Sequence, residues 1–337
     1  MGKKFSGASQ IMSRFRGWIQ AGAALLTNLH LPNFLKGKLY QGAGKTVCVP
    51  GLNCYSCPAA SGACPIGAFQ AVVGSSKFSF SYYITGFLIL LGVLLGRFIC
   101  GFLCPFGWFQ ELLHKIPTKK FSTKKLKPLR YLKYAVLLVM VFLLPAFLVN
   151  DVGMGDPFFC KYLCPQGVLE GAIPLSLANS GIRSALGSLF TWKFGILLAV
   201  IVLSVIFYRP FCKWLCPLGA FYALFNRVSL FQIKVDKNKC VSCGKCAKAC
   251  KMDVDVTKAP NHTECIRCGM CVNNCPVGAI DRNDPTKVDA SLCLRCLSCV
   301  RLGPLGSKAF TDPGFQKTVA WCLENFQKPD KSPAFFL

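Results

Sequence analysis

The spacing of the cysteines limits what this chain can fold into more than any other feature. The chain has 22 cysteines among 337 residues, and many are separated by only two or three residues. In a small secreted domain so many cysteines would indicate disulfides. Here the short intervals, the prolines that often follow the cysteines and the lysine-rich surroundings favour metal ligation instead.

Eight cysteines form two successive runs with the spacing Cys-x2-Cys-x2-Cys-x3-Cys. This is the pattern of bacterial ferredoxins with two [4Fe–4S] clusters, in which the fourth cysteine of each run binds the cluster of the other run. Lys251 replaces the proline that usually follows the first run, a minor departure, and the absence of histidine argues against zinc. The sequence therefore predicts one cluster on Cys240, Cys243, Cys246 and Cys275 and another on Cys265, Cys268, Cys271 and Cys250.

A third run, Cys293, Cys296 and Cys299, has no fourth cysteine close by. We expect a further cluster on it, with Cys322 as a candidate fourth ligand, and a degenerate site is the alternative. The runs define an α+β ferredoxin-like domain at residues 231–300, followed by a C-terminal extension at 301–337.

The rest of the chain is too apolar for a simple soluble enzyme, because 53% of all residues are hydrophobic and only 16% are charged. About 20 mostly apolar residues cross a bilayer. Four segments fit this length, the first of them weakly because polar residues interrupt it: 18–35, 80–99, 131–149 and 190–208. We therefore expect residues 1–230 to form an all-α membrane domain with four transmembrane helices.

The positive charges predict the orientation of these helices. Lys and Arg outnumber Asp and Glu by 39 to 14. They cluster beside apolar segments, as cytoplasmic flanks do, rather than on a polar face that could bind nucleic acid. The basic loop 115–130 is thus expected in the cytoplasm and the loop 150–189 outside. Four spans then place both termini in the cytoplasm of a multi-pass protein surrounded by lipid.

The membrane part contains a fourfold internal repeat. The tetrapeptide Cys-Pro-x-Gly occurs four times, and in three copies another cysteine precedes it by four residues. The four copies begin at Cys64, Cys104, Cys164 and Cys216, and the preceding cysteines are Cys100, Cys160 and Cys212. In the expected topology the copies alternate between outside and inside, so the chain divides into two tandem halves.

This repeat suits the binding of iron–sulfur clusters. Proline fits the first position of a helix, where its missing N–H is not needed. Each cysteine then precedes a helix whose N-terminal N–H groups and dipole favour a thiolate. Two Cys-x3-Cys pairs supply the four thiolates of one [4Fe–4S] cluster. We expect one cluster at the cytoplasmic face on Cys100, Cys104, Cys212 and Cys216.

The expected outer face has six cysteines rather than four, so its ligand set stays open. The preferred set for a cluster is Cys57, Cys64, Cys160 and Cys164. The rival set is Cys48, Cys54, Cys57 and Cys64. Disulfides in an oxidising compartment are the alternative to a cluster.

Signatures of other chemistry are missing from the sequence. Three histidines, only one of them near a span, do not supply the paired ligands of a membrane b-type haem, and there is no Rossmann fingerprint. No serine–histidine–aspartate arrangement or pair of carboxylates stands out. We therefore assign no catalytic residue and expect an electron-transfer subunit whose catalytic partner lies elsewhere.

The two inner Cys-x3-Cys-Pro motifs, the spans between them and the C-terminal ferredoxin resemble the membrane-bound polyferredoxins of the NapH/NosR type. These are quinol-dehydrogenase and electron-relay subunits of anaerobic respiration, and the resemblance covers about residues 10–285. It implies four-helix anchorage in a prokaryotic cytoplasmic membrane, [4Fe–4S] clusters at the cytoplasmic face and electron exchange with quinol or a flavoprotein. The sequence departs from the family in its outer cysteines, between Cys48 and Cys64 and at Cys160 and Cys164.

Together these patterns favour an electron conduit across the membrane. A cytoplasmic ferredoxin or flavoprotein would reduce the ferredoxin domain, and electrons would leave from the outer cluster to an extracytoplasmic flavin or reductase. The membrane interior is about 30 Å thick, so the clusters must be sunk into it or a quinone must bridge them. The alternatives are a quinol dehydrogenase with clusters on the inner face only, and a redox or iron sensor.

Overall fold

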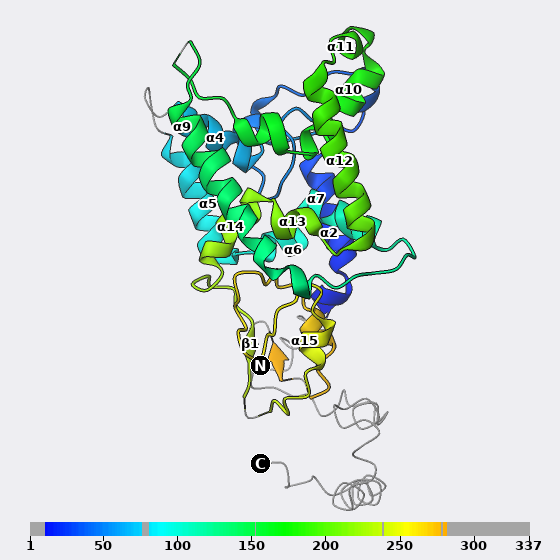
Figure 1. Cartoon of the computed structure of the whole chain (residues 1–337), viewed down its shortest axis with the longest axis vertical. Coiled ribbons are helices and arrows are strands. Elements are labelled where there is room, and N and C mark those ends of the chain that lie inside the picture. The colour runs from blue at the N-terminus through cyan, green and yellow to red at the C-terminus, as the bar shows by residue number, and fades with distance from the viewer. Residues whose placement is uncertain (1–10, 76–80, 152, 238, 278, 282–337) are drawn as a thin grey trace, which may run out of the picture.

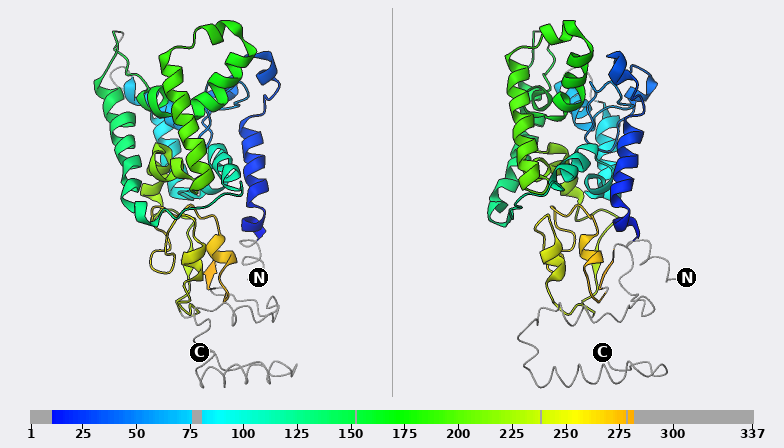
Figure 2. Two further views of the ribbon diagram at one scale, coloured as in Figure 1. Left: turned by 45° about the vertical axis from the view of Figure 1, so that its right-hand side comes forward. Right: turned by 90° about the vertical axis from the view of Figure 1, so that its right-hand side faces the viewer.

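The computed structural model describes residues 11–75, 81–151, 153–237, 239–277 and 279–281. In these residues a larger helical body stands above a small cysteine-rich domain (Figure 1). The turned views show the same division (Figure 2). Cys293, Cys296, Cys299 and Cys322 lie outside the described residues, so the cluster expected on them stays a prediction.

The helical body consists of long helices around short ones. Its first part contains α2 (Arg16–Thr27), α3 (Asn33–Lys36), the 3-10 turn η1 (Ala43–Thr46), α4 (Pro65–Gly74), α5 (Tyr82–Leu95), α6 (Phe98–Phe102) and α7 (Pro105–His114). Its second part contains η2 (Lys124–Tyr131), α8 (Leu132–Val136), η3 (Leu137–Leu143), α9 (Leu144–Phe147), η4 (Phe159–Leu163), η5 (Gly167–Ala172), α10 (Ile173–Ala178), α11 (Ser180–Ser184), α12 (Ser188–Ile206), α13 (Pro210–Trp214) and α14 (Pro217–Phe225).

Two helices of the described part are long and apolar enough to cross a membrane. They are Lys124–Phe147, which runs from η2 to α9, and α12. α12 exposes large apolar side chains such as Trp192 and Val202, as a helix that faces lipid does. These two helices correspond to the spans expected at 131–149 and 190–208.

The other two expected spans form shorter helices, so the count of four spans stays a prediction. α5 has 14 residues and stops at Gly96, whose φ of +52° suits glycine. α2 has 12 residues. Its Gln20, one of the polar residues that interrupt the apolar segment, is buried and donates a hydrogen bond of 3.0 Å to the carbonyl oxygen of Gly101 in α6. Trp18 on the same helix is exposed.

The helices that follow the Cys-Pro pairs begin as predicted. α4, α7 and α14 each start at the proline, directly after Cys64, Cys104 and Cys216. The remaining copy, which begins at Cys164, leads into the π-helical turn η5, which starts two residues after Pro165. The three cysteines that precede a Cys-Pro pair lie on the short helices α6, η4 and α13. All these cysteines therefore lie near the ends of short helices inside the body, where α6 and α13 are visible in Figure 1.

The small domain has the mixed α and β structure that its cysteine runs predict. Its strands β1 (Lys234–Val235) and β2 (Ile280–Asp281) pair antiparallel, with Lys234 opposite Asp281, and its helices are α15 (Lys245–Ala249) and α16 (Met270–Asn273). Its core contains Ile233, Val256 and Ile280 together with buried cysteines. A core this small is typical of a domain that relies on bound metal for its stability.

Candidate iron–sulfur cluster sites

The two cysteine loops of the small domain have the same backbone conformation. Ser242 and Arg267, each directly before the second cysteine of its run, have φ values of +51° and +53°. Gly244 and Gly269, directly after that cysteine, have φ values of +69° and +82°. Left-handed backbone at non-glycine residues is uncommon and is often found at functional sites. The repetition at matching positions indicates that both loops curl around a bound group.

The structure brings together the two crosswise cysteine sets that the sequence predicts. Two small hollows, of about 10 and 20 Å³, lie inside the loops. The first hollow is lined by Cys240, Cys243, Cys246 and Cys275, and we call this the distal set. The second is lined by Cys250, Cys265, Cys268 and Cys271, and we call this the proximal set.

The spacing of the cysteines fits a cluster better than a single ion. Four sulfur atoms bound to one zinc at 2.3 Å lie about 3.8 Å apart. Among the described residues no three histidine, cysteine, aspartate or glutamate side chains come close enough to hold one metal ion. Cysteines that line a common hollow without meeting at one point suit the larger [4Fe–4S] core.

Buried ion pairs attach the small domain to the helical body at one corner. Asp253, three residues after Cys250, accepts hydrogen bonds from Thr123, from Arg130 at 3.2 Å and from Lys213 at 3.1 Å. Burial opposes ionisation of this carboxyl, but these partners outweigh it and lower the pKa of Asp253. Lys213 is 1% exposed and follows Cys212 directly, so this contact joins the loop of the proximal set to the helix that carries Cys212.

A second group of ion pairs attaches the domain at Glu264, which precedes Cys265. The carboxylate accepts hydrogen bonds from Lys133 and, at 2.9 Å, from Arg97. Burial alone would raise the pKa of Glu264, but the charges of Arg97 and Lys133 lower it to about 2. Breaking a buried ion pair by removing one partner typically destabilises by about 3–5 kcal/mol, so this contact holds the domain in a fixed position.

The loop of the proximal set also touches the helices of the inner motifs directly. Arg267, fully buried between Cys265 and Cys268, donates hydrogen bonds to the carbonyl oxygens of Leu95 and Asn226 at 2.8 and 2.7 Å. Gly101 on α6 packs so closely on the domain that a Cβ atom there would collide with the carbonyl oxygen of Ile266. The proximal set therefore lies beside the helix that carries Cys100.

The four cysteines of the expected inner cluster lie on two pairs of short helices in the core of the body. We call Cys100, Cys104, Cys212 and Cys216 the inner set, and all four are buried. Arg97 and Arg209, each three residues before the first cysteine of a pair, are also fully buried. Three nitrogen atoms of these arginines, Nε and Nη2 of Arg97 and Nη2 of Arg209, have no hydrogen-bond acceptor among the described residues. Unpaired buried donors next to four cysteines fit an anionic cluster, whose sulfur atoms accept hydrogen bonds.

A glutamine at matching positions supports both membrane sites. Gln110, six residues after Cys104, donates a hydrogen bond of 3.1 Å to the sulfur of Cys212 and accepts one of 3.2 Å from the N–H of Phe211. Gln70, six residues after Cys64, donates one of 3.2 Å to the sulfur of Cys160 and accepts one of 2.9 Å from Phe159. The pairing of Cys64 with Cys160 on one side thus repeats that of Cys104 with Cys212 on the other.

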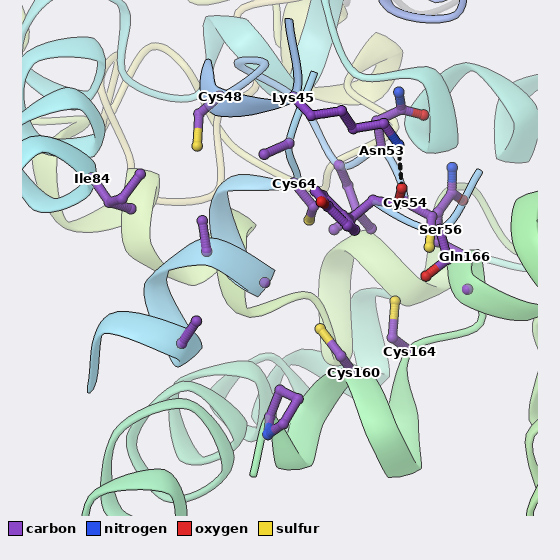
Figure 3. Close-up of a pocket in the computed structure, with 18 of the residues that line it drawn as sticks. Lys45, Cys48, Asn53, Cys54, Ser56, Cys64, Ile84, Cys160, Cys164 and Gln166 are labelled. Atoms are coloured by element: carbon purple, nitrogen blue, oxygen red, sulfur yellow. Dashed lines mark hydrogen bonds between the residues drawn. The ribbon is translucent and has the colours of Figure 1, made fainter. Parts of the chain in front are cut away.

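A cavity of about 540 Å³ contains most of the cysteines expected at the outer face (Figure 3). Its lining includes Cys48, Cys54, Cys64, Cys160 and Cys164. In Figure 3 the sulfur atoms of the last four face a common space, and Cys48 stands apart. No disulfide forms among the described cysteines.

Cys57 does not line this cavity, although it belongs to both sets that the sequence favours. It is fully buried, and its sulfur lies 3.5 Å from Oδ1 of Asn28. Cys54 occupies the expected place instead, and its N–H donates a hydrogen bond of 3.1 Å to Glu170. The geometry thus supports a set of Cys54, Cys64, Cys160 and Cys164, which we call the outer set.

Sequence reasoning missed the polar residues that surround these cysteines. Aligning the four Cys-Pro-x-Gly copies would have shown a polar or aromatic residue six positions after each cysteine. These residues are Gln70, Gln110, Glu170 and Tyr222, and each makes a hydrogen bond to backbone or to sulfur. The buried arginines could have been found because both precede a cysteine pair by three residues.

Comparisons with known proteins agree with this geometry. A model described as a 4Fe-4S binding domain matches residues 62–82, 79–124, 133–173 and 189–238. A second model with the same description matches residues 233–254 and 259–281. No solved structure matches the chain.

Three relatives illustrate the similarity. An uncharacterized protein of Methanocaldococcus jannaschii is 32% identical over 187 residues, which is 52% of this chain and 68% of the relative. The methylamine utilization ferredoxin-type protein MauN of Paracoccus denitrificans is 27% identical over 55% of this chain and 56% of MauN. The regulatory protein NosR of Stutzerimonas stutzeri is 27% identical over 48% of this chain and 21% of NosR.

The chain spans only about half of MauN and a fifth of NosR. The residues that match the two 4Fe-4S binding-domain models contain the Cys-Pro-x-Gly copies and the two ferredoxin runs described above. The chain belongs to the ferredoxin-type electron-transport proteins of the NapH/NosR kind, which transfer electrons through [4Fe–4S] clusters.

Proposed function

We propose that this chain is a membrane electron relay that connects a cytoplasmic donor with an acceptor on the opposite face. The observation that carries the proposal is the fixed contact between the proximal set and α6, made through Arg97, Glu264 and Gly101. A [4Fe–4S] cluster, when bound, supplies a one-electron carrier. The distal, proximal, inner and outer sets each provide four thiolates for one cluster, in this order along the molecule.

The residues of the chain position these thiolates and shield them from water. The inner cysteines are buried among aromatic side chains such as Phe106 and Phe211, whose rings lie 5.0 Å apart edge to face. Gln70 and Gln110 fix the orientation of one cysteine in each membrane site. The outer set lines a cavity of about 540 Å³, and α4, which begins directly after Cys64, lies in the part of the body away from the small domain (Figure 1).

The membrane location and the partners belong to the same proposal. We place the chain in a prokaryotic cytoplasmic membrane, with both termini and the ferredoxin domain in the cytoplasm. The basic residues of the loop 115–130, close to the small domain, support this orientation. The donor is then a cytoplasmic ferredoxin or flavoprotein, and the acceptor is an extracytoplasmic flavin or reductase.

The proposal is tested by moving electrons across a closed membrane. The full chain with its clusters is inserted in one orientation into quinone-free vesicles that enclose a membrane-impermeant dye. Reduction of the ferredoxin domain from outside should reduce the dye inside, and a Cys160→Ser/Cys164→Ser variant should lose this transfer together with about four iron atoms per chain. Transfer that survives in this variant, or that is absent from the intact chain, would contradict the relay. Steady transfer also excludes a pure sensor.

Oxidation of quinol on the cytoplasmic side is a second candidate function, favoured by another cavity. A cavity of about 390 Å³ between α2, α7 and the small domain is lined by Arg16, Trp108, Glu111, His114 and Tyr208, and also by Cys268 of the proximal set. A ring with two carbonyl or hydroxyl groups suits such a mixed polar and aromatic lining beside a cysteine ligand. A Trp108→Ala variant should then lose reduction of the clusters by a soluble quinol and retain reduction by dithionite.

A further inference from the structure

The inner set is flanked by two arginines that occupy equivalent positions in the chain. Arg97 lies three residues before Cys100, and Arg209 lies three residues before Cys212. Both side chains are 0% exposed. A fully buried guanidinium is rare and requires hydrogen-bond acceptors or anions around it.

Each arginine reaches across to the Cys-Pro-x-Gly motif of the other helix pair. A Cβ atom added to Gly219 would lie 3.5 Å from Nη2 of Arg97 and 3.7 Å from the sulfur of Cys216. A Cβ atom added to Gly107, three residues after Cys104, would lie 3.0 Å from the guanidinium carbon of Arg209. The two guanidinium groups therefore lie beside the two Cys-Pro-x-Gly motifs that carry Cys104 and Cys216.

Only part of each guanidinium is used by the protein. Nη1 of Arg97 donates to the carbonyl oxygen of Thr263 and to Glu264, both at 2.9 Å. Nη1 of Arg209 donates to the carbonyl oxygen of Cys100 at 2.5 Å, and its Nε lies 2.8 Å from Glu111. Nε and Nη2 of Arg97 and Nη2 of Arg209 find no acceptor among the described residues.

The outer set has no such pair. Arg97 and Arg209 each lie seven residues before the cysteine of a Cys-Pro pair, and the residues at the same position before Cys164 and Cys64 are Pro157 and Cys57. Lys193 approaches the outer set through a hydrogen bond of 3.0 Å that its Nζ donates to the carbonyl oxygen of Cys160. The two sites share a Cys-x3-Cys pair and a glutamine that bonds to sulfur, but they differ in the number of buried N–H donors.

We propose that Arg97 and Arg209 donate N–H hydrogen bonds to the sulfur atoms of the inner cluster and raise its reduction potential. Reduction adds one negative charge to the cluster, and donors aimed at the sulfur atoms stabilise that charge. The inner cluster then holds an electron more readily than it would without the two arginines. This inference rests on the inner cluster of the proposed relay.

The test is a redox titration of the full chain followed by electron paramagnetic resonance. The inner signal is identified as the one that disappears in a Cys104→Ser/Cys216→Ser variant. The first variant is Arg209→Gln, because among the described residues Arg209 makes no hydrogen bond or ion pair with the small domain, and Arg97→Gln is the second. Each variant should shift the equilibrium of the inner cluster about tenfold toward the oxidised form, which corresponds to a fall of about 59 mV in its one-electron reduction potential. The other signals should keep their potentials.

Two further variants distinguish an effect of Arg209 on the reduction potential from a purely structural role of this residue. Arg209→Lys keeps the charge but has fewer donors in a less suitable geometry, so its shift should be smaller than that of Arg209→Gln. Arg130→Gln removes a buried arginine that pairs with Asp253 instead, and it should leave the inner potential unchanged. Equal potentials in the intact chain, Arg209→Gln and Arg97→Gln, with iron content intact, would overturn the inference.

The hydrogen bonds can also be detected directly in the intact protein, which keeps the test valid if a variant fails to bind its cluster. Electron spin echo modulation of the intact protein, grown with ¹⁵N-arginine, should show the ¹⁵N label coupled to the reduced inner cluster. A reduced inner cluster without any arginine coupling contradicts the hydrogen bonds. If the inner signal is missing from the intact chain, the relay itself fails, and the two failures are thereby distinguished.

Discussion

At the scale of single residues, the structure explains why glycine occupies the fourth position of a Cys-Pro-x-Gly motif. In the copy that begins at Cys104 this glycine makes room for an arginine from the other helix pair, because a Cβ atom at Gly107 would lie only 3.0 Å from the guanidinium carbon of Arg209. In the copies that begin at Cys164 and Cys216 a Cβ atom would lie in ordinary contact, 3.5 Å from Lys193 and from Arg97. The glycine is therefore required for the approach of a cation at Gly107.

The two inner glycines offer a matched comparison. In Gly107→Ala the new Cβ lies 3.0 Å from the guanidinium carbon of Arg209, which is tighter than ordinary contacts, so the arginine must move. In Gly219→Ala the contact is 3.5 Å, which is ordinary packing. We expect Gly107→Ala to lower the inner potential or the iron content while Gly219→Ala keeps both. Equal behaviour of the two variants in a redox titration with iron analysis would contradict this reading.

The outer cysteines allow a second comparison at this scale. Cys54 lines the outer cavity with Cys64, whereas Cys57 faces Asn28 on another side. Cys54→Ser should therefore lose about four iron atoms per chain, and Cys57→Ser should lose none. Loss of iron from Cys57→Ser alone would restore the set that the sequence favours.

At the scale of elements, the sequence predicts what is local and misses what depends on tertiary contacts. Proline after Cys64, Cys104 and Cys216 correctly predicts where α4, α7 and α14 begin, because proline restricts the backbone at its own position. The choice between Cys54 and Cys57 depends on how the loop 48–64 folds against α2 and η5, which no local pattern encodes. The apolar segments 18–35 and 80–99 form shorter helices, because α2 ends at Thr27 and α5 ends at Leu95, directly before Gly96.

The contact between α6 and the small domain can be tested with one methyl group. Gly101→Ala would place a Cβ atom against the carbonyl oxygen of Ile266, and backbone cannot move aside easily. Such overpacking typically costs about 1–3 kcal/mol. We expect faster hydrogen exchange in residues 239–277 and slower electron transfer between the proximal and inner clusters. Gly86→Ala on α5 is the control, because nothing lies within 4 Å of that Cβ position.

At the scale of the whole molecule, the ferredoxin domain is attached to the helical body by the two carboxylates Asp253 and Glu264. Each has a lowered pKa because cations of the body outweigh the effect of burial. A carboxyl with a lowered pKa in the docked state stabilises docking fully above its ordinary pKa, and this contribution is lost as the pH falls through the lowered value. The pH range of ordinary cells therefore leaves the attachment intact.

The lowered pKa values of Asp253 and Glu264 predict how docking of the domain depends on pH. On the acid side of neutrality, docking of the domain should weaken only below about pH 4, near the ordinary pKa of carboxyl groups. Protection of residues 239–277 against a protease that works across the range from pH 5 to 8 is the measurement. Asp253→Asn should weaken docking at every pH in this range, because Lys213 then lacks its anionic partner. Release of the domain at pH 5.5 in the unaltered chain would contradict the assignment.

The crossing of arginines and cysteines between helix pairs also has a consequence for how the protein is made. The inner set needs Cys104 and Arg97 from the first part of the chain and Cys216 and Arg209 from the second. The outer set likewise combines Cys64 with Cys160 and Cys164. The residues of the outer set are all present once the chain has been synthesised past Cys164, whereas the inner set needs synthesis past Cys216. Iron delivery to the inner site must therefore follow synthesis of both parts, and a chain truncated before α13 carries no inner site to fill.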